Sequence, residues 1–133
     1  MKKKLFVFDI ETIPDIEFAG DFLNITNESE AEIYKKIAAY HDSEKAPEEI
    51  FLKPVFHKIV AISFAEIEVE MVAGKEEYFL SDLRSAGNLD SSEEDLTKGF
   101  FQYLEKNSPR IVSYNGRAFD FPVMKFKALK YGI

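Results

Sequence analysis

The stretch LFVFDIETIPD, residues 5–15, ends an apolar run with two acidic side chains that lie two residues apart. Side chains of an extended strand alternate between its two faces. One face therefore carries Leu5, Val7, Asp9 and Glu11, and the other carries Phe6, Phe8 and Ile10. Both faces are apolar before Asp9, which predicts a central strand of a sheet, covered on both sides, with an acidic pair at its carboxyl end.

Asp9 and Glu11 repel each other on this face unless something neutralises them. Either one carboxyl takes up a proton, or a divalent cation lies between the two side chains. The pair taken alone is also compatible with a solvated strand end that holds no ion.

Composition limits the classes of protein. With 133 residues, 46% of them hydrophobic, and 13 Phe, the chain is expected to form one domain with its own core. The lack of cysteine excludes disulfides and thiolate zinc sites within it and fits a reducing, cytoplasmic location.

The net charge of −7 argues against binding nucleic acid through a broadly basic surface, although metal ions can offset phosphate charge locally. The apolar run that stops at Asp9 is too short for export or for a membrane span, so no membrane association is expected.

The periodicity of the first two thirds predicts one helix and a meander of three strands. The helix runs from Ser29 to Tyr40, with Ile33, Ile37 and Ala38 on its apolar side. Residues 58–80 are rich in Ile, Val and Phe around Gly74, which predicts two antiparallel strands joined by a tight turn.

The last third predicts a helix, a strand and a helix. Ser91 and Glu94 have capping-box spacing, and the helix after them places Leu96, Phe100, Tyr103 and Leu104 on one face. RIVSY, residues 110–114, reads as a buried strand, and a last helix from about Phe121 is expected to point Val123, Phe126 and Leu129 inward. A strand, helix, strand order implies a parallel crossover, so residues 110–114 are expected beside the first strand.

A second group of chemically capable residues lies in SYNGRAFDFPVM, residues 113–124. Asn115 and Gly116 end the predicted strand, and Asp120 enters the last helix. Parallel neighbours end at the same edge of a sheet, where open α/β sheets bind ligands. Asp120 is therefore expected to approach Asp9 and Glu11, giving three hard oxygen ligands suited to Mg²⁺ or Mn²⁺. Glycine at 116 permits a conformation or a close approach that larger residues resist.

Two motifs carry a resemblance to a known superfamily. FDIET, residues 8–12, resembles the first motif of the DEDD superfamily of 3′-5′ exonucleases, and NGRAFD, residues 115–120, resembles its second, Asn-x-x-x-Phe-Asp. FDIETIP, FHKIVAIS and NGRAFDFPV together are similar, in that order, to stand-alone bacterial proteins related to the proofreading domain of family-B DNA polymerases. The resemblance implies an α/β, RNase H-like mixed sheet with flanking helices and four catalytic carboxylates that bind two divalent metal ions, Mg²⁺ or Mn²⁺.

The resemblance also implies roles for particular residues. Asp9, Glu11 and Asp120 match three of the four catalytic metal ligands. The implied reaction is in-line attack by metal-activated water on the terminal phosphodiester of DNA or RNA, releasing 5′-mononucleotides. The implied partner is single-stranded nucleic acid or a 3′ end, with contacts expected from Thr12, Asn115, Arg117 and Phe119.

The chain departs from the family pattern at the fourth carboxylate. The family supplies it after the second motif, preceded at four-residue spacing by Tyr or His, and the sequence ends at Ile133 without such a segment. Tyr78 and Asp82 have that spacing but lie between the first two motifs, which favours a strand end with this spacing by chance. Residues 1–133 are therefore expected to be the N-terminal part of one exonuclease-like domain, incomplete at its C-terminal end.

Several charged residues also have a purely structural interpretation. Asp120 alone is more often a helix cap than a ligand, and the acid-rich residues 90–95 are best explained as a helix start. Lys125, Lys127 and Lys130 are expected on the solvent side of the last helix.

Two other functions remain open from the sequence. A haloacid dehalogenase-type phosphatase also begins with a strand that ends in two acids, but its second acid is Asp, where this chain has Glu11. The other is a catalytically inactive fragment that binds nucleic acid or a protein partner, which the missing fourth aspartate favours.

Overall fold

The computed structural model describes residues 3–41, 44–45 and 49–133. The chain divides into two compact units, each with its own core. We call Met1–Thr12 with Ile59–Ile133 the sheet unit, and Ile13–Lys58 the helical unit.

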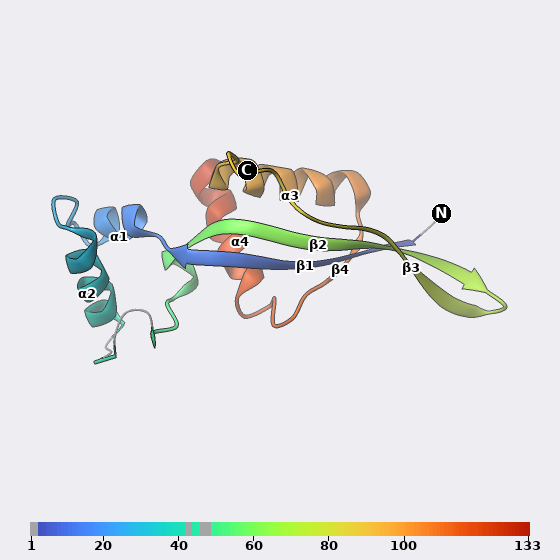
Figure 1. The fold of residues 1–133 in the computed structure, drawn as a ribbon, viewed down its shortest axis with the longest axis horizontal. Coiled ribbons are helices and arrows are strands. Elements are labelled where there is room, and N and C mark those ends of the chain that lie inside the picture. Colours follow the sequence, from blue (N-terminus) through green and yellow to red (C-terminus); the bar gives the residue numbers. More distant parts are fainter. Residues whose placement is uncertain (1–2, 42–43, 46–48) are drawn as a thin grey trace. The chain divides into compact units, whose positions relative to one another are not determined.

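A four-stranded mixed sheet in the order β3-β2-β1-β4 organises the sheet unit (Figure 1). Its strands are β1 (Lys3–Pro14), β2 (His57–Val72), β3 (Lys75–Ser85) and β4 (Arg110–Val112). The first three form an antiparallel meander, and β4 pairs with β1 in parallel, with Phe6 opposite Ile111. This arrangement confirms the predicted α/β class and is consistent with an RNase H-like fold. β4 is two residues shorter than predicted.

A two-residue turn joins β2 to β3. Ala73 and Gly74 have φ of 50° and 80°, as the tight hairpin turns with two left-handed positions require, and Val72 pairs with Lys75 across the turn. Figure 1 shows the tip of this hairpin projecting past the beginning of β1. Tyr78 and Asp82 lie inside β3 rather than at a strand end, so that detail of the prediction is wrong.

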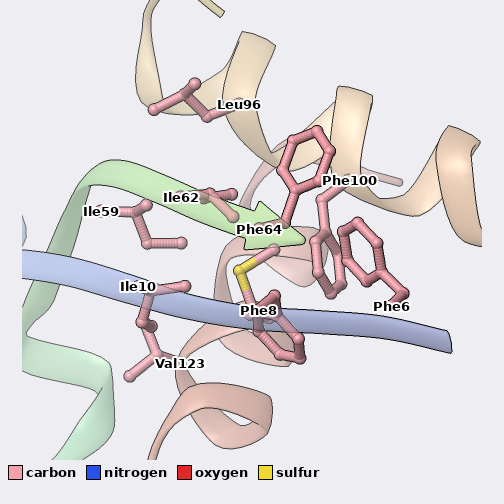
Figure 2. Close-up of a cluster of buried hydrophobic side chains, with 10 residues drawn as sticks. Phe6, Phe8, Ile10, Ile59, Ile62, Phe64, Leu96, Phe100 and Val123 are labelled. Atoms are coloured by element: carbon pink, nitrogen blue, oxygen red, sulfur yellow. The ribbon is translucent and has the colours of Figure 1, made fainter. Parts of the chain in front are cut away.

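The core of the sheet unit lies on one face of β1 and β2. Phe6, Phe8 and Ile10 project from this face of β1, as the alternation predicted, and they are 2–4% exposed. Figure 2 shows them packed with Ile62 and Phe64 of β2, Leu96 and Phe100 of helix α3 (Glu93–Asn107), and Val123 of helix α4 (Asp120–Tyr131). Burial of each large apolar side chain contributes about 1.5–3 kcal/mol.

The other face of β1 is less covered than predicted. Leu5 and Val7 are only half-buried, and within the sheet unit both helices pack against the Phe6 face. The predicted cover on both sides of β1 is therefore incomplete within the sheet unit, because side chains of α3 and α4 join the same core.

The N-cap of helix α3 lies one residue later in the sequence than predicted. Ser92 is its N-cap and forms a capping box with Asp95, in which each side chain accepts from the other residue's backbone N–H. Ser91 instead accepts a hydrogen bond from the Asn88 N–H in the preceding turn. The acid-rich stretch is thus a helix start, as predicted, with its capping pair displaced by one residue.

Helix α4 turns a different face inward from the one predicted. Val123 is buried as expected, but Phe126 and Leu129 are 43% and 78% exposed. Its buried residues are Asp120, Val123, Met124 and Lys127, at positions i, i+3, i+4 and i+7. Lys127 is also not on the solvent side, because its Nζ lies 3.3 Å from Oε1 of the buried Glu93.

Glu93 is the centre of a buried polar cluster. Its Oε2 accepts the Ile59 N–H at 2.6 Å, and its Oε1 accepts the Tyr131 hydroxyl at 2.7 Å. Lys127 compensates the charge, as a buried carboxylate requires.

The helical unit contains α1 (Ile16–Phe22), α2 (Glu30–Tyr40) and a 3₁₀ turn, η2 (Pro54–Phe56). Helix α2 and its N-cap, Ser29, confirm the predicted helix, whereas the seven-residue α1 was not predicted. The core gathers around Phe56, whose ring centroid lies within 5.3–5.6 Å of those of Phe18, Phe22 and Tyr40. No helix in the described ranges is long and apolar enough to cross a membrane.

Candidate functional site

The carboxyl ends of β1 and β4 set the position of the candidate site. Val7 pairs with Val112, and side chains of parallel neighbours at matching positions share one face. Asp9 lies two residues beyond Val7 on β1, whereas β4 ends at Val112. Asp9 and Glu11 are both exposed, on the face opposite the Phe6 core.

The turn from β4 into α4 depends on residues 115 and 116. Asn115 has a φ of 53°, the left-handed conformation that Asn adopts more readily than most residues. A Cβ on Gly116 would lie 1.9 Å from Ser113 Oγ and 2.8 Å from Ser113 Cβ, so only glycine fits. The predicted need for glycine at position 116 is thus confirmed, and its cause is the close approach of Ser113. The left-handed backbone conformation belongs to the neighbouring Asn115.

Backbone hydrogen bonds hold this turn closed. The N–H groups of Ala118 and Phe119 donate to the Asn115 carbonyl, and the Phe121 N–H donates to the Gly116 carbonyl at 2.9 Å. The turn therefore delivers Asp120 to the first residue of α4 in a defined position.

Asp120 is buried without full compensation. It is 2% exposed, and its Oδ1 has no hydrogen-bond partner among the described residues. Burial raises the pKa of the Asp120 carboxyl above its ordinary value; the backbone N–H of Asp120 opposes the rise, the charge of Asp9 adds to it, and the Ile10 N–H opposes it. These interactions place the Asp120 carboxylate against β1 at Ile10, within electrostatic range of Asp9.

A capping role does not explain Asp120. The N-cap position of α4 is Phe119, and no side chain caps this helix end. A buried carboxyl oxygen without a partner loses hydration that nothing in the described structure replaces. The helix-cap alternative from the sequence is therefore disfavoured, and the unpartnered oxygen is available to a proton or to a ligand.

The donor chemistry fits a hard divalent cation. Asp9 and Asp120 supply carboxylate oxygens that repel each other, and a cation would satisfy Asp120 Oδ1 and relieve the repulsion together. In the part of the chain that the structure describes, however, no three Asp, Glu or His side chains are grouped as a metal site. The pair of Asp9 and Asp120 is thus what the structure supports, with Glu11 exposed two residues along β1.

The predicted nucleic-acid contacts lie in two places. Thr12 is half-buried near the end of β1, whereas Asn115, Arg117 and Phe119 belong to the turn before α4. Arg117 and Asn115 are exposed, and Phe119 is half-buried against the core of the sheet unit.

Sequence reasoning missed the exposure of Tyr114. Residues 110–114 were predicted as a buried strand, but the Tyr114 side chain is 93% exposed. The strand ends at Val112, and Tyr114 lies in the bend that follows it, so the predicted burial does not extend to this side chain.

Comparison with known proteins relates the chain to one family. Residues 49–133, more than half of the chain, match the model of a family described as "Predicted 3'-5' exonuclease related to the exonuclease domain of PolB". The matched part contains Asn115, Arg117, Phe119 and Asp120, whereas Asp9, Glu11 and Thr12 precede it. A search of curated proteins found no significant match.

Proposed function

The chain belongs to the family of predicted 3′-5′ exonucleases related to the exonuclease domain of PolB, and we propose that it hydrolyses terminal phosphodiesters at the 3′ end of single-stranded DNA or RNA, releasing 5′-mononucleotides. Asp120 carries this proposal. It is a buried carboxylate with an unsatisfied oxygen, held at the carboxyl edge of the sheet within the electrostatic influence of Asp9.

Asp9, Glu11 and Asp120 would hold divalent ions, Mg²⁺ or Mn²⁺. When bound, such ions activate water and neutralise charge on the departing 3′ oxygen. Asp120 would be the most rigidly held of these ligands, because the turn around Gly116 and its burial restrict its side chain. Asp9 and Glu11 supply the exposed side, which a nucleic-acid end can reach.

Arg117 and the turn before α4 would orient the strand. The Arg117 side chain is exposed in the same turn as Asp120, and a guanidinium suits bidentate contact with a phosphate. The net charge of −7 makes such local cations more important, because the surface as a whole repels a polyanion.

Hydrolysis is tested on the purified 133-residue chain with 5′-labelled single-stranded DNA and RNA and Mn²⁺. The proposal expects a ladder shortened stepwise from the 3′ end, 5′-mononucleotides as product, and loss of both in Asp9→Ala. Asp90→Ala is the matched control, since Asp90 is an exposed aspartate of the sheet unit outside the site. Turnover that persists in Asp9→Ala at the wild-type rate would contradict the assignment.

A nucleic-acid-binding module without turnover is the second candidate. One observation favours it: no group of three metal-binding side chains is present within the described ranges. Strand binding by the wild-type chain with no product in Mg²⁺ or Mn²⁺ would select it. The family match offers no support for the phosphatase alternative.

A further inference from the structure

A groove crosses the sheet face opposite the buried core. It has a volume of about 420 Å³ and belongs wholly to the sheet unit. The side chains on this face that line it are Val7, Asp9, Ser63, Ala65, Leu83 and Tyr114. Asp9 is the single charged residue of the lining, so the groove is an apolar surface that begins at the candidate site.

Tyr114 forms one wall of this groove with a ring that is 93% exposed. Asp9 lines the same groove, so the ring shares this concave surface with a proposed catalytic carboxylate. Leu83, on β3, is 70% exposed and belongs to the same lining. Exposed aromatic and aliphatic groups gathered in a concave surface mark a binding site more often than isolated exposed residues do.

The charge pattern selects which part of a nucleotide fits. A phosphate in the groove would meet the Asp9 carboxylate with no cationic group in the lining, whereas a nucleobase is neutral, flat and able to stack on an aromatic ring. A base in the groove would leave its phosphate near Asp9, where the proposed metal ions would meet it. On the proposed function, on which this inference rests, we propose that the groove receives the base of the 3′-terminal nucleotide and that the Tyr114 ring stacks on it.

Stacking of this kind has a consequence for specificity. Every base presents a π face, and the hydrogen-bonding groups of the lining side chains are few: Ser63, Asp9 and the Tyr114 hydroxyl. The site is therefore expected to accept all four terminal bases with small differences in affinity.

The inference is tested by equilibrium binding, measured as fluorescence anisotropy with Ca²⁺ in place of Mg²⁺ or Mn²⁺. The two probes are a labelled single-stranded oligonucleotide with an ordinary 3′ nucleotide and the same strand with an abasic 3′ end. Tyr114→Ala is expected to weaken binding of the ordinary strand roughly ten-fold and to leave the abasic strand unchanged. Tyr114→Phe retains the ring and is expected to bind like the wild-type chain.

Tyr78→Ala is the matched control, because Tyr78 is an exposed tyrosine of the same unit outside the groove. It should bind both probes like the wild-type chain. Since Tyr114 is almost fully exposed, its substitutions should leave the thermal unfolding midpoint unchanged.

The outcomes separate the two proposals. Equal affinity of Tyr114→Ala and the wild-type chain for both probes would overturn the groove assignment, while loss of turnover in Asp9→Ala would still support the exonuclease. If Tyr114→Ala changes sedimentation instead of strand binding, a second copy of the chain covers this face and the inference is overturned. A wild-type chain that neither binds nor cleaves the strand would overturn both.

Discussion

Among the described residues, each unit of the molecule contains one almost fully buried aspartate, and the two differ in their hydrogen bonding. Asp15 of the helical unit is 1% exposed, and its Oδ1 accepts the Phe18 N–H at 3.1 Å as the N-cap of α1. Asp120 of the sheet unit is 2% exposed, and its Oδ1 has no hydrogen-bond partner in the described structure. Burial of an acid is therefore not by itself a sign of function; an unsatisfied oxygen at the edge of a sheet is the more informative feature.

The two units also differ in how many polar side chains are buried with their cores. The core of the helical unit is built from apolar and aromatic side chains around Phe56, and a cavity of about 520 Å³ in this unit is lined by no predicted site residue. The sheet unit combines a large apolar core with the buried Glu93 and Lys127 pair and with Asp120. Polar burial is thus concentrated in the unit that carries the candidate chemistry.

Phe56→Ala should have the largest effect, about 4 kcal/mol of destabilisation, because a fully buried ring is lost from a small core. Hydrogen exchange read separately for the two units would show faster exchange in Ile13–Lys58, with the amides of Phe6 and Phe8 still protected. Equal loss of protection in both units would break the comparison between two separate cores.

Glu93→Ala should destabilise the protein by about 3 kcal/mol, because it leaves the Lys127 ammonium buried without its carboxylate. Replacement of both partners by Met should recover most of that loss, since no charge then remains buried. Chemical denaturation of the wild-type chain and of these two variants measures this. A double variant as unstable as Glu93→Ala would indicate that the hydrogen bonds from Ile59 and Tyr131, not the charge pair, carry the energy.

Asp120→Asn should reduce turnover by at least about 100-fold, the scale of losing one well-placed charged group in a catalytic site. The same change should stabilise the metal-free protein at neutral pH. Since the pKa of the Asp120 carboxyl is raised above its ordinary 3.8, the folded state binds that proton more tightly than the unfolded state does. Its ionisation therefore costs stability as pH rises from 3.8 through the raised value, and the gain from Asn should vanish below 3.8.

Thermal unfolding in EDTA from acid to neutral pH tests the expected gain in stability of Asp120→Asn, and rates in Mn²⁺ test its expected loss of turnover. A variant that is less stable than the wild-type protein at neutral pH would show that the buried charge is compensated after all.

Asp15→Ala should have the smallest effect, about 1 kcal/mol, the usual value of a lost N-cap, with turnover unchanged. Unfolding midpoints and turnover rates of Asp15→Ala, measured alongside those of Asp120→Asn, compare the two buried aspartates directly. A large loss of turnover in Asp15→Ala would remove the contrast between the two buried aspartates.

The strands were predictable because their cause is local. Alternation along LFVFDIETIPD identified the buried face of β1, and the change of period after residue 90 identified a helix between two parallel strands. The close approach at Gly116 was also predictable, since a residue without Cβ in a tight strand-to-helix turn indicates a steric limit.

The inward face of α4 was not predictable in the same way. Phe126 and Leu129 are the more hydrophobic choices, but Lys127 is buried because Glu93, from the start of another helix, meets it there. The short helix α1 was missed for a related reason, because its seven residues provide too few turns for a clear period.

By itself, the sequence determined the order of strands and helices, the parallel pairing of β1 with β4, and therefore the edge of the sheet to which Asp9, Glu11 and Asp120 belong. Only the tertiary structure decided that Asp120 is buried with an unsatisfied oxygen, that Lys127 turns inward, and that Tyr114 is exposed in the groove that Asp9 also lines. The physical reason is range: periodicity reports the geometry of a backbone segment a few residues long, whereas desolvation and charge compensation depend on which distant segments come into contact.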